Sequence, residues 1–97
     1  LLFQDKAIVA NNVINPLHGD TAIIRFIVDD DAFVKIVIYD KNIRPVSVIL
    51  NEQKGRGTYE ATWSGKNDNN QIVSEGIYFV YIQIGTKVIK KNIIVNK

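Results

Sequence analysis

Short apolar segments recur about every ten residues along the chain, and clusters of Asn, Asp, Gly and Lys separate them. This spacing is typical of an all-β sandwich, in which each short strand ends at a turn. No segment sustains the 3.6-residue period of an amphipathic helix. We therefore predict a seven-stranded antiparallel β-sandwich. The expected strands are Ala7–Ala10, Thr21–Val28, Ala32–Tyr39, Arg44–Leu50, Gly57–Trp63, Gly76–Ile84 and Lys87–Val95.

Alternation inside the second and third strands predicts which face enters the core, because successive side chains of a strand point to opposite faces. The run Asp29–Asp31 joins these two strands, where aspartate side chains stabilise a turn. We interpret it as a hairpin tip rather than as a catalytic carboxylate pair, which needs a cleft. The inward set is Ile24, Phe26 and Val28 in one strand and Val34, Ile36 and Ile38 in the other.

The sixth strand, Gly76–Ile84, is apolar on both faces, which predicts a central position in its sheet. If Tyr78, Val80 and Ile82 face the core, an apolar patch is left on the outside. That patch is either a docking surface for a neighbouring domain or an ordinary surface with some exposed aromatics. Its members are Ile77, Phe79 and Tyr81, joined by Val37 and Tyr39 of the third strand.

Composition narrows the classes of function. The 97 residues include no cysteine, which excludes a disulfide framework and any thiolate metal site. A net charge of +2, with acids and bases interspersed, gives no field of one sign, so we expect no nucleic-acid partner. The apolar runs are far shorter than the roughly 20 residues needed to span a bilayer, so we expect no membrane insertion.

Four features occur in order along the chain, and together they resemble the FlgD Ig-like family, a module of the immunoglobulin or fibronectin type III kind. The features are Asn15-Pro16, Thr21–Val28, Ile38-Tyr39-Asp40 with Arg44 four residues on, and Trp63-Ser64-Gly65 running through Gly76-Ile77-Tyr78-Phe79. The ending, with Lys90 and Lys91 before Ile93-Ile94-Val95, is similar to the C-terminal sorting domains of the type IX secretion system. The resemblance implies an Ig-like β-sandwich.

The chain departs from the family pattern at two turns. The family has Asp, Asp and Gly where this chain has Ser64, Asn67 and Asn70, and we expect Asn70 to adopt the left-handed conformation of the glycine. The glycine that precedes the family's arginine is Ile43 here, so we expect Asn42 to take the positive φ instead.

The loop from Ser64 to Gln71 is the most tempting candidate site. Its side-chain oxygens suit calcium, and Asp68 is the ligand to test, although the spacing fails the EF-hand template. We favour a turn held by side-chain to backbone bonds.

Trp63 beside the loop could stack on a sugar with Tyr59 as companion, but the alternation favours a core position. Tyr78 is expected to place its ring in the core and to bond its hydroxyl to nearby backbone.

The sequence gives little support to a catalytic function. His18 is the only histidine, in a stretch that we interpret as a loop, and no serine stands in the context of a nucleophile elbow. Gly55-Arg56-Gly57 precedes a strand rather than a helix, so it lacks the helix terminus that binds phosphate. We therefore expect no enzyme, no metal and no cofactor.

The resemblance implies a non-catalytic accessory domain of a secreted or cell-surface bacterial protein. We expect residues 1–97 to form one domain at the C-terminal end of a larger protein, with residues 1–11 as either a linker or a first edge strand. The domain would serve in sorting or anchoring, with secretion machinery recognising Lys90, Lys91 and the last strand, or as a spacer packed on a neighbouring domain. The alternative is an adhesive module that binds polysaccharide or protein.

Overall fold

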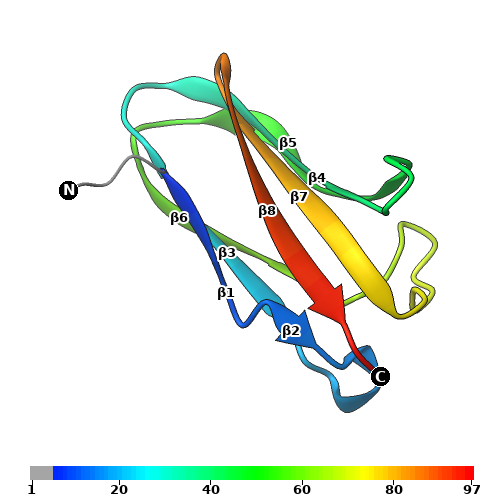
Figure 1. Ribbon diagram of the computed structural model, residues 1–97. Coiled ribbons are helices and arrows are strands. Elements are labelled where there is room, and N and C mark those ends of the chain that lie inside the picture. The colour runs from blue at the N-terminus through cyan, green and yellow to red at the C-terminus, as the bar shows by residue number, and fades with distance from the viewer. Residues whose placement is uncertain (1–5) are drawn as a thin grey trace.

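A computed structural model describes residues 6–97 as two β-sheets packed face to face (Figure 1). One sheet has three strands in the order β1-β3-β6, and the other has five in the order β2-β8-β7-β4-β5. The described residues contain no helix that is long and apolar enough to cross a membrane. The elements are β1 (Ala7–Ala10), β2 (Val13–Ile14), the 3-10 helix η1 (Pro16–His18), β3 (Ala22–Val28), β4 (Ala32–Tyr39), β5 (Pro45–Lys54), β6 (Gly57–Trp63), β7 (Gly76–Ile84) and β8 (Lys87–Val95).

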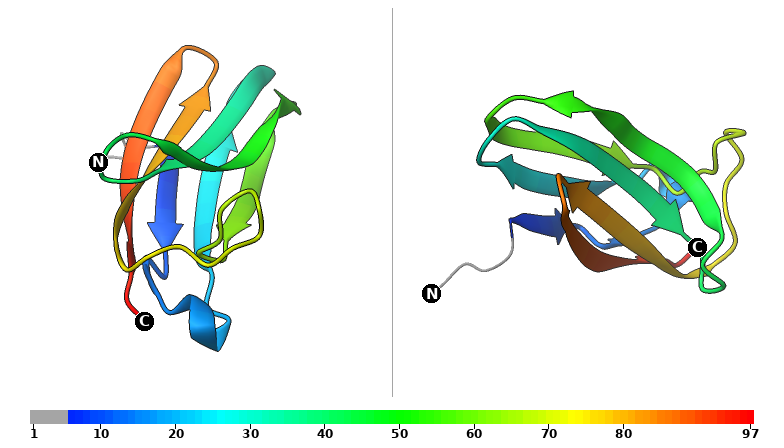
Figure 2. Two further views of the ribbon diagram at one scale, coloured as in Figure 1. Left: turned by 90° about the vertical axis from the view of Figure 1, so that its right-hand side faces the viewer. Right: turned by 90° about the horizontal axis from the view of Figure 1, so that it is seen from above.

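The predicted all-β sandwich is confirmed, but the prediction that it has seven strands, all antiparallel, was wrong in both respects. An eighth strand, β2, pairs in parallel with the end of β8, so the five-stranded sheet is mixed. The chain leaves β1 through Asn11, at a φ of 55°, and crosses from the small sheet to the large one. Figure 2 shows β1 and β8 on the same side of the sandwich. A strand of two residues is too short to show an alternation of apolar and polar side chains, so the sequence pattern did not predict β2.

Five of the seven predicted ranges match the observed strands, and the other two differ at their ends. The strand predicted as Arg44–Leu50 extends to Lys54, because its polar end pairs with the first residues of β4. The segment Asp29–Asp31 is not a hairpin tip, since β3 and β4 belong to different sheets. It is a connection between the two layers at one end of the sandwich.

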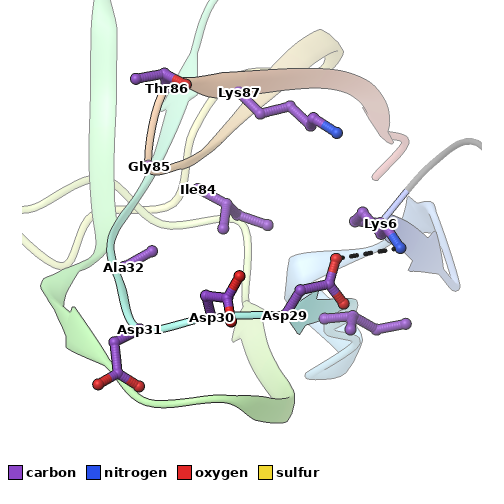
Figure 3. A pocket seen from close by; sticks show the side chains of 10 residues that line it. Lys6, Asp29, Asp30, Asp31, Ala32, Ile84, Gly85, Thr86 and Lys87 are labelled. Atoms are coloured by element: carbon purple, nitrogen blue, oxygen red, sulfur yellow. Dashed lines mark ion pairs between the residues drawn. The ribbon is translucent and has the colours of Figure 1, made fainter.

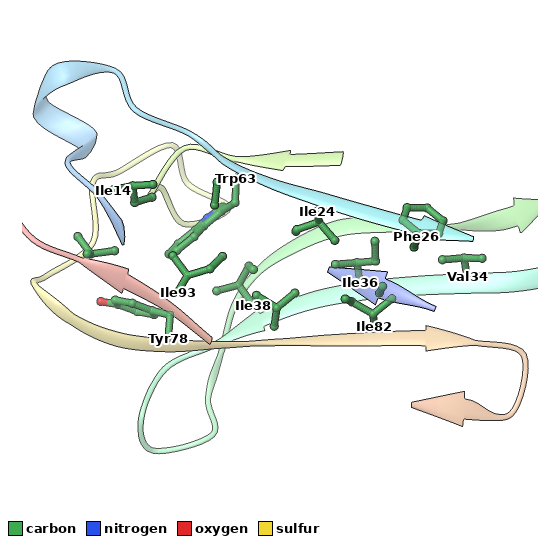
Figure 4. Packing of buried hydrophobic residues seen from close by; sticks show 14 of the residues in the cluster. Ile14, Ile24, Phe26, Val34, Ile36, Ile38, Trp63, Tyr78, Ile82 and Ile93 are labelled. Atoms are coloured by element: carbon green, nitrogen blue, oxygen red, sulfur yellow. The ribbon is translucent and has the colours of Figure 1, made fainter. Parts of the chain in front are cut away.

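The core lies between the sheets and contains the predicted inward residues of β3, β4 and β7. Trp63, at the end of β6, is only 2% exposed and closes one end of this core against Tyr78 (Figure 4). Burying a large side chain contributes about 1.5–3 kcal/mol, so these positions dominate the stability of the fold. The largest fully buried side chains are Phe26, Ile14, Ile24, Ile36, Ile38, Ile82, Ile93, Val28, Val34, Val80 and Val95.

The turn between β4 and β5 corrects one expectation. Ile43, and not Asn42, has the positive φ, at 61°. The amide of Ile43 donates to the Asp40 carbonyl, and the amides of Asn42 and Arg44 both donate to the Asp40 carboxylate. A three-residue loop built on a type I turn needs its third residue in the left-handed region, whatever residue stands there. The geometry of the hairpin therefore determines which residue has the positive φ.

Replacing Ile43 by glycine is expected to raise the free energy of unfolding by about 1 kcal/mol, because a β-branched residue in the left-handed region is strained. Ile43 is 55% exposed, so the change removes little core. Urea unfolding measures the gain. Asn42→Gly is the matched control, and it should bring no gain because Asn42 is outside the positive-φ region. Equal effects of the two substitutions would contradict the assignment of strain to Ile43.

Candidate functional site

The outward-facing side of the five-stranded sheet, here called the outer face, is the most distinctive surface of the domain. The registers of β2, β4, β5, β7 and β8 place its side chains in neighbouring rows. Its charged residues are Lys35 and Lys90. Glu52, the acidic residue of these strands, lies opposite the buried Val34 and therefore on the other side. The apolar members are Val13, Phe33, Val37, Tyr39, Val48, Ile77, Phe79, Tyr81, Val88 and Ile94.

Three aromatic residues form the centre of the outer face. Tyr39 and Tyr81 meet edge to face, with ring centroids 5.0 Å apart and an interplanar angle of 78°. The ammonium of Lys90 lies 4.6 Å from the centroid of the Phe79 ring, a cation–π geometry. Beneath them Val37 is only 5% exposed, although it points away from the core. The rings are thus packed on one another or under a lysine, and they form a fixed platform rather than separate stacking rings.

The structure brings together most of the predicted interaction residues, from the outer patch and from the last strand, and separates one. Ile77, Phe79, Tyr81, Tyr39 and Lys90 share the outer face. Lys91 does not, because it pairs with the buried Val80 and its side chain is directed to the other side of β8. Adjacent residues of a strand cannot share a face. The two lysines therefore serve different surfaces, and their part in recognition stays a prediction.

The opposite surface of the sandwich has a different character. On the three-stranded sheet Arg25 pairs with Glu60 at 2.6 Å, so charges of both signs are present. The outer face has lysines, and the one carboxylate of its strands, Glu52, pairs with Lys54 at 2.7 Å on the opposite side of β5. An apolar centre surrounded by side chains of a single charge sign is typical of a surface that contacts another molecule. The sequence alone did not assign Val48 and Ile94 to the outer face. Their neighbours on that face depend on how β5 and β8 pair with the adjacent strands.

The loop from Ser64 to Gln71 is organised by its own side chains. Asn67 accepts the amides of Asn69 and Gln71 at 2.9 and 3.0 Å, and Asn70 adopts the predicted left-handed φ, at 63°. Within residues 6–97 no three His, Asp or Glu side chains are grouped as metal ligands. The calcium hypothesis stays a prediction, while the turn held by side-chain bonds is observed.

Asp68 ties this loop to the edge of β5. Its carboxylate accepts from the Ser47 hydroxyl at 3.0 Å and from the Val48 amide at 3.2 Å, and its own amide donates to the Val46 carbonyl at 3.1 Å. These bonds take the place of a neighbouring strand over the first half of β5. An edge covered in this way cannot pair with another chain.

Trp63 and Tyr78 occupy the positions expected of core residues. The indole of Trp63 donates to the Lys66 carbonyl at 2.8 Å, and the Tyr78 hydroxyl donates to the Ser74 carbonyl at 2.7 Å, as predicted. Burial raises the pKa of Tyr78, and the nearby Asp40 carboxylate adds to the rise. Tyr59 stacks on Phe26 at 5.5 Å. Trp63 is consequently inaccessible for stacking on a sugar.

Asn15-Pro16 and Trp63-Ser64-Gly65, far apart in sequence, meet at one end of the sandwich. Asn15 caps η1 by accepting the Leu17 amide at 3.0 Å. Gly65, at a φ of 78°, lies so close to the Pro16 ring that an added Cβ would be 2.8 Å from Pro16 Cγ. The stretch around His18, expected as a loop, contains η1, and His18 itself is exposed at its end.

An open hollow of about 290 Å³ lies where the connection Asp29–Asp31 approaches the turn between β7 and β8 (Figure 3). Lys6 and Asp29 form an ion pair at 3.3 Å on one wall, and Lys87 lies on another. Asp29, Asp30 and Asp31 are exposed to solvent. The hollow is thus lined by charges of both signs.

No protein-family profile matches the chain, and no curated protein is similar to it in sequence. The fold is similar to part of a solved structure of PorZ, described as an essential bacterial surface component of the type IX secretion system of Porphyromonas gingivalis. The TM-score is 0.64 and the identity is 20%. The match covers 94% of this chain and 11% of that chain, so this chain spans a small part of the PorZ length. Such a likeness shows the fold, and the FlgD Ig-like assignment stays a prediction.

Proposed function

We propose that this chain is a non-catalytic, Ig-like accessory domain of an exported bacterial protein associated with type IX secretion, and that it packs on a neighbouring domain through the outer face. The observation that carries this proposal is the composition of that face, with an aromatic centre, two lysines and no carboxylate. The likeness to part of PorZ supports the secretion context.

Packing on a protein fits the outer face better than binding a polysaccharide. Sugar recognition uses an aromatic ring with an open face, whereas Phe79 lies under Lys90 and Tyr39 meets Tyr81 edge to face. A continuous apolar sheet face suits the flat contact between two domains of one chain. Sorting or anchoring remains a second role for the same domain, since a folded terminal module can be recognised by export machinery.

The test uses thermal unfolding of the parent protein and of the isolated domain. We expect the domain to unfold at a higher temperature within the parent, because contact with a neighbour stabilises the folded state. Ile77→Lys with Ile94→Lys, two register partners on the outer face, should remove that difference. Ile27→Lys is the matched control, because Ile27 is 43% exposed on the other sheet and Ile77 is 38% exposed.

Identical unfolding temperatures of the domain alone and within the parent would contradict docking. The sorting role has a separate readout, which is the location of the parent protein after removal of residues 12–97. If the truncated parent stays in the periplasm, the domain is required for export. If export is unchanged and docking is observed, the domain is a spacer.

A further inference from the structure

Among residues 6–97, most of the outward edge of β8 has no neighbouring strand. β2 pairs only with Ile94 and Val95, where the amide of Ile94 donates to the Asn12 carbonyl at 2.7 Å. Amides of alternate residues point to the same side of a strand, so the amides two, four and six residues earlier point to this edge as well. No strand formed by residues 6–97 pairs with them. These edge amides belong to Val88, Lys90 and Asn92.

The β8 edge is also the most regular edge of the large sheet. Its register with β7 runs without interruption from Gly76 opposite Val95 to Ile84 opposite Lys87. β5, at the other edge, has two register shifts and is covered by Asp68. Bulges and coverings of this kind prevent strand addition, and within residues 6–97 no bulge interrupts β8 and no strand covers its outward edge between Val88 and Asn92. The shape of this edge therefore suits an added strand.

A shallow groove runs beside this edge, with a volume of about 410 Å³. It separates β8 from β1, which belongs to the other sheet. A strand added to β8 would direct alternate side chains toward this groove and the others toward the outer face. The groove is lined by Ile8, Val9, Asn12, Lys90, Lys91 and Asn92.

Charge selects the occupant of the edge. The segment from Gly76 to Val95 contains three lysines, Lys87, Lys90 and Lys91, and no acidic residue. Two copies of the chain paired through β8 would bring these lysines together, and like charges on facing strands are destabilising. A strand that carries carboxylates would instead be attracted by Lys87 and Lys90. The edge therefore disfavours a second copy and favours an acidic partner.

We propose that the edge of β8 left unpaired by residues 6–97 receives an extended acidic segment of a partner protein, which adds a strand along Val88 to Asn92. Main-chain hydrogen bonds to the three edge amides supply the pairing, and Lys87 and Lys90 select carboxylates on the incoming strand. This inference goes beyond the proposed function, because it uses the edge of the sheet and not its outer face.

The test is an NMR titration of the isotopically labelled domain with three synthetic heptapeptides. One alternates Glu and Val, one alternates Lys and Val, and the third is the Glu–Val peptide with alternate backbone nitrogens methylated. We expect the first peptide alone to shift the amides of Val88, Lys90 and Asn92 and to slow their hydrogen exchange. The Lys–Val peptide should bind about tenfold more weakly or not at all, because it repels the lysines. The methylated peptide keeps the charges but lacks the backbone N–H groups that an added strand would donate to β8.

Two variants check that the edge amide is responsible. Lys90→Pro removes one edge amide without touching the bonds to β7, and it should abolish the exchange protection. Lys90→Ala keeps that amide and should retain the pattern at reduced affinity. Equal binding of the methylated peptide, or shifts only outside β8, would overturn the proposal. Concentration-dependent shifts of the same amides without peptide, together with a dimer in sedimentation, would overturn it in favour of a second copy. None of these outcomes depends on docking through the outer face.

Discussion

Gly65→Ala is expected to lower the free energy of unfolding by about 3 kcal/mol, measured by urea denaturation. Two costs add at this position. The φ of 78° is strained for alanine, and the new methyl group would lie 2.8 and 2.9 Å from two carbons of the Pro16 ring. A proline ring cannot turn away as a flexible side chain can, so η1 or the loop after β6 has to shift.

Gly19 separates the two costs. It has the same φ of 78°, but no atom lies within 4 Å of an added Cβ. Gly19→Ala should therefore lose only about 1 kcal/mol, the cost of the backbone conformation. The double variant Pro16→Ala with Gly65→Ala should be more stable than the sum of the single losses predicts, because the contact with Pro16 Cγ is removed and the open chain of alanine can move its Cβ away. Equal losses for Gly19→Ala and Gly65→Ala would show that contact with Pro16 is unimportant.

Asp68→Ala is expected to lower the free energy of unfolding by about 2 kcal/mol, because it leaves the Ser47 hydroxyl and the Val48 amide without their charged acceptor. Ser47 is only 7% exposed, so water cannot fully replace the lost bond. Urea denaturation measures the loss. Asn69→Ala, in the same exposed loop, is the control and should change stability little. Losses of equal size would contradict a specific role for Asp68.

Asp68→Asn also tests the calcium hypothesis. Asparagine keeps one acceptor oxygen, so its loss of stability should be smaller than that of alanine. If calcium stabilises the wild-type domain and not Asp68→Asn, the carboxylate is a calcium ligand. If calcium changes the unfolding of neither protein, Asp68 acts only through its bonds to β5.

The core could be predicted from the sequence because its signal is local. A strand with one buried face repeats every two residues, so Ile24 and Phe26 identify their own orientation without knowledge of their neighbours. The same reasoning placed Tyr78 inward and Phe79 outward. It failed for β2, whose two residues contain no repeat, and for the polar end of β5, which is a strand only because β4 lies beside it.

The missing parts of the site depend on contacts between distant residues. Asp68 binds β5 twenty residues earlier in the chain, and nothing in its own loop indicates this. Lys90 and Lys91 look equivalent in sequence, yet the strand sends them to opposite sides. Ile43 has the positive φ because the hairpin requires it at that position, although Asn42 is the better residue for that conformation.

The parallel pairing of β2 with β8 also determines how the domain responds to mechanical force. A pull along the chain between β1 and Lys97 draws these two parallel strands in opposite directions. The bonds from Ile94 to Asn12 and from Asn96 to Ile14 then bear the load together in shear, instead of opening one after another. The rate of forced unfolding is set by this barrier. A two-residue strand can thus act as a mechanical latch for the whole domain.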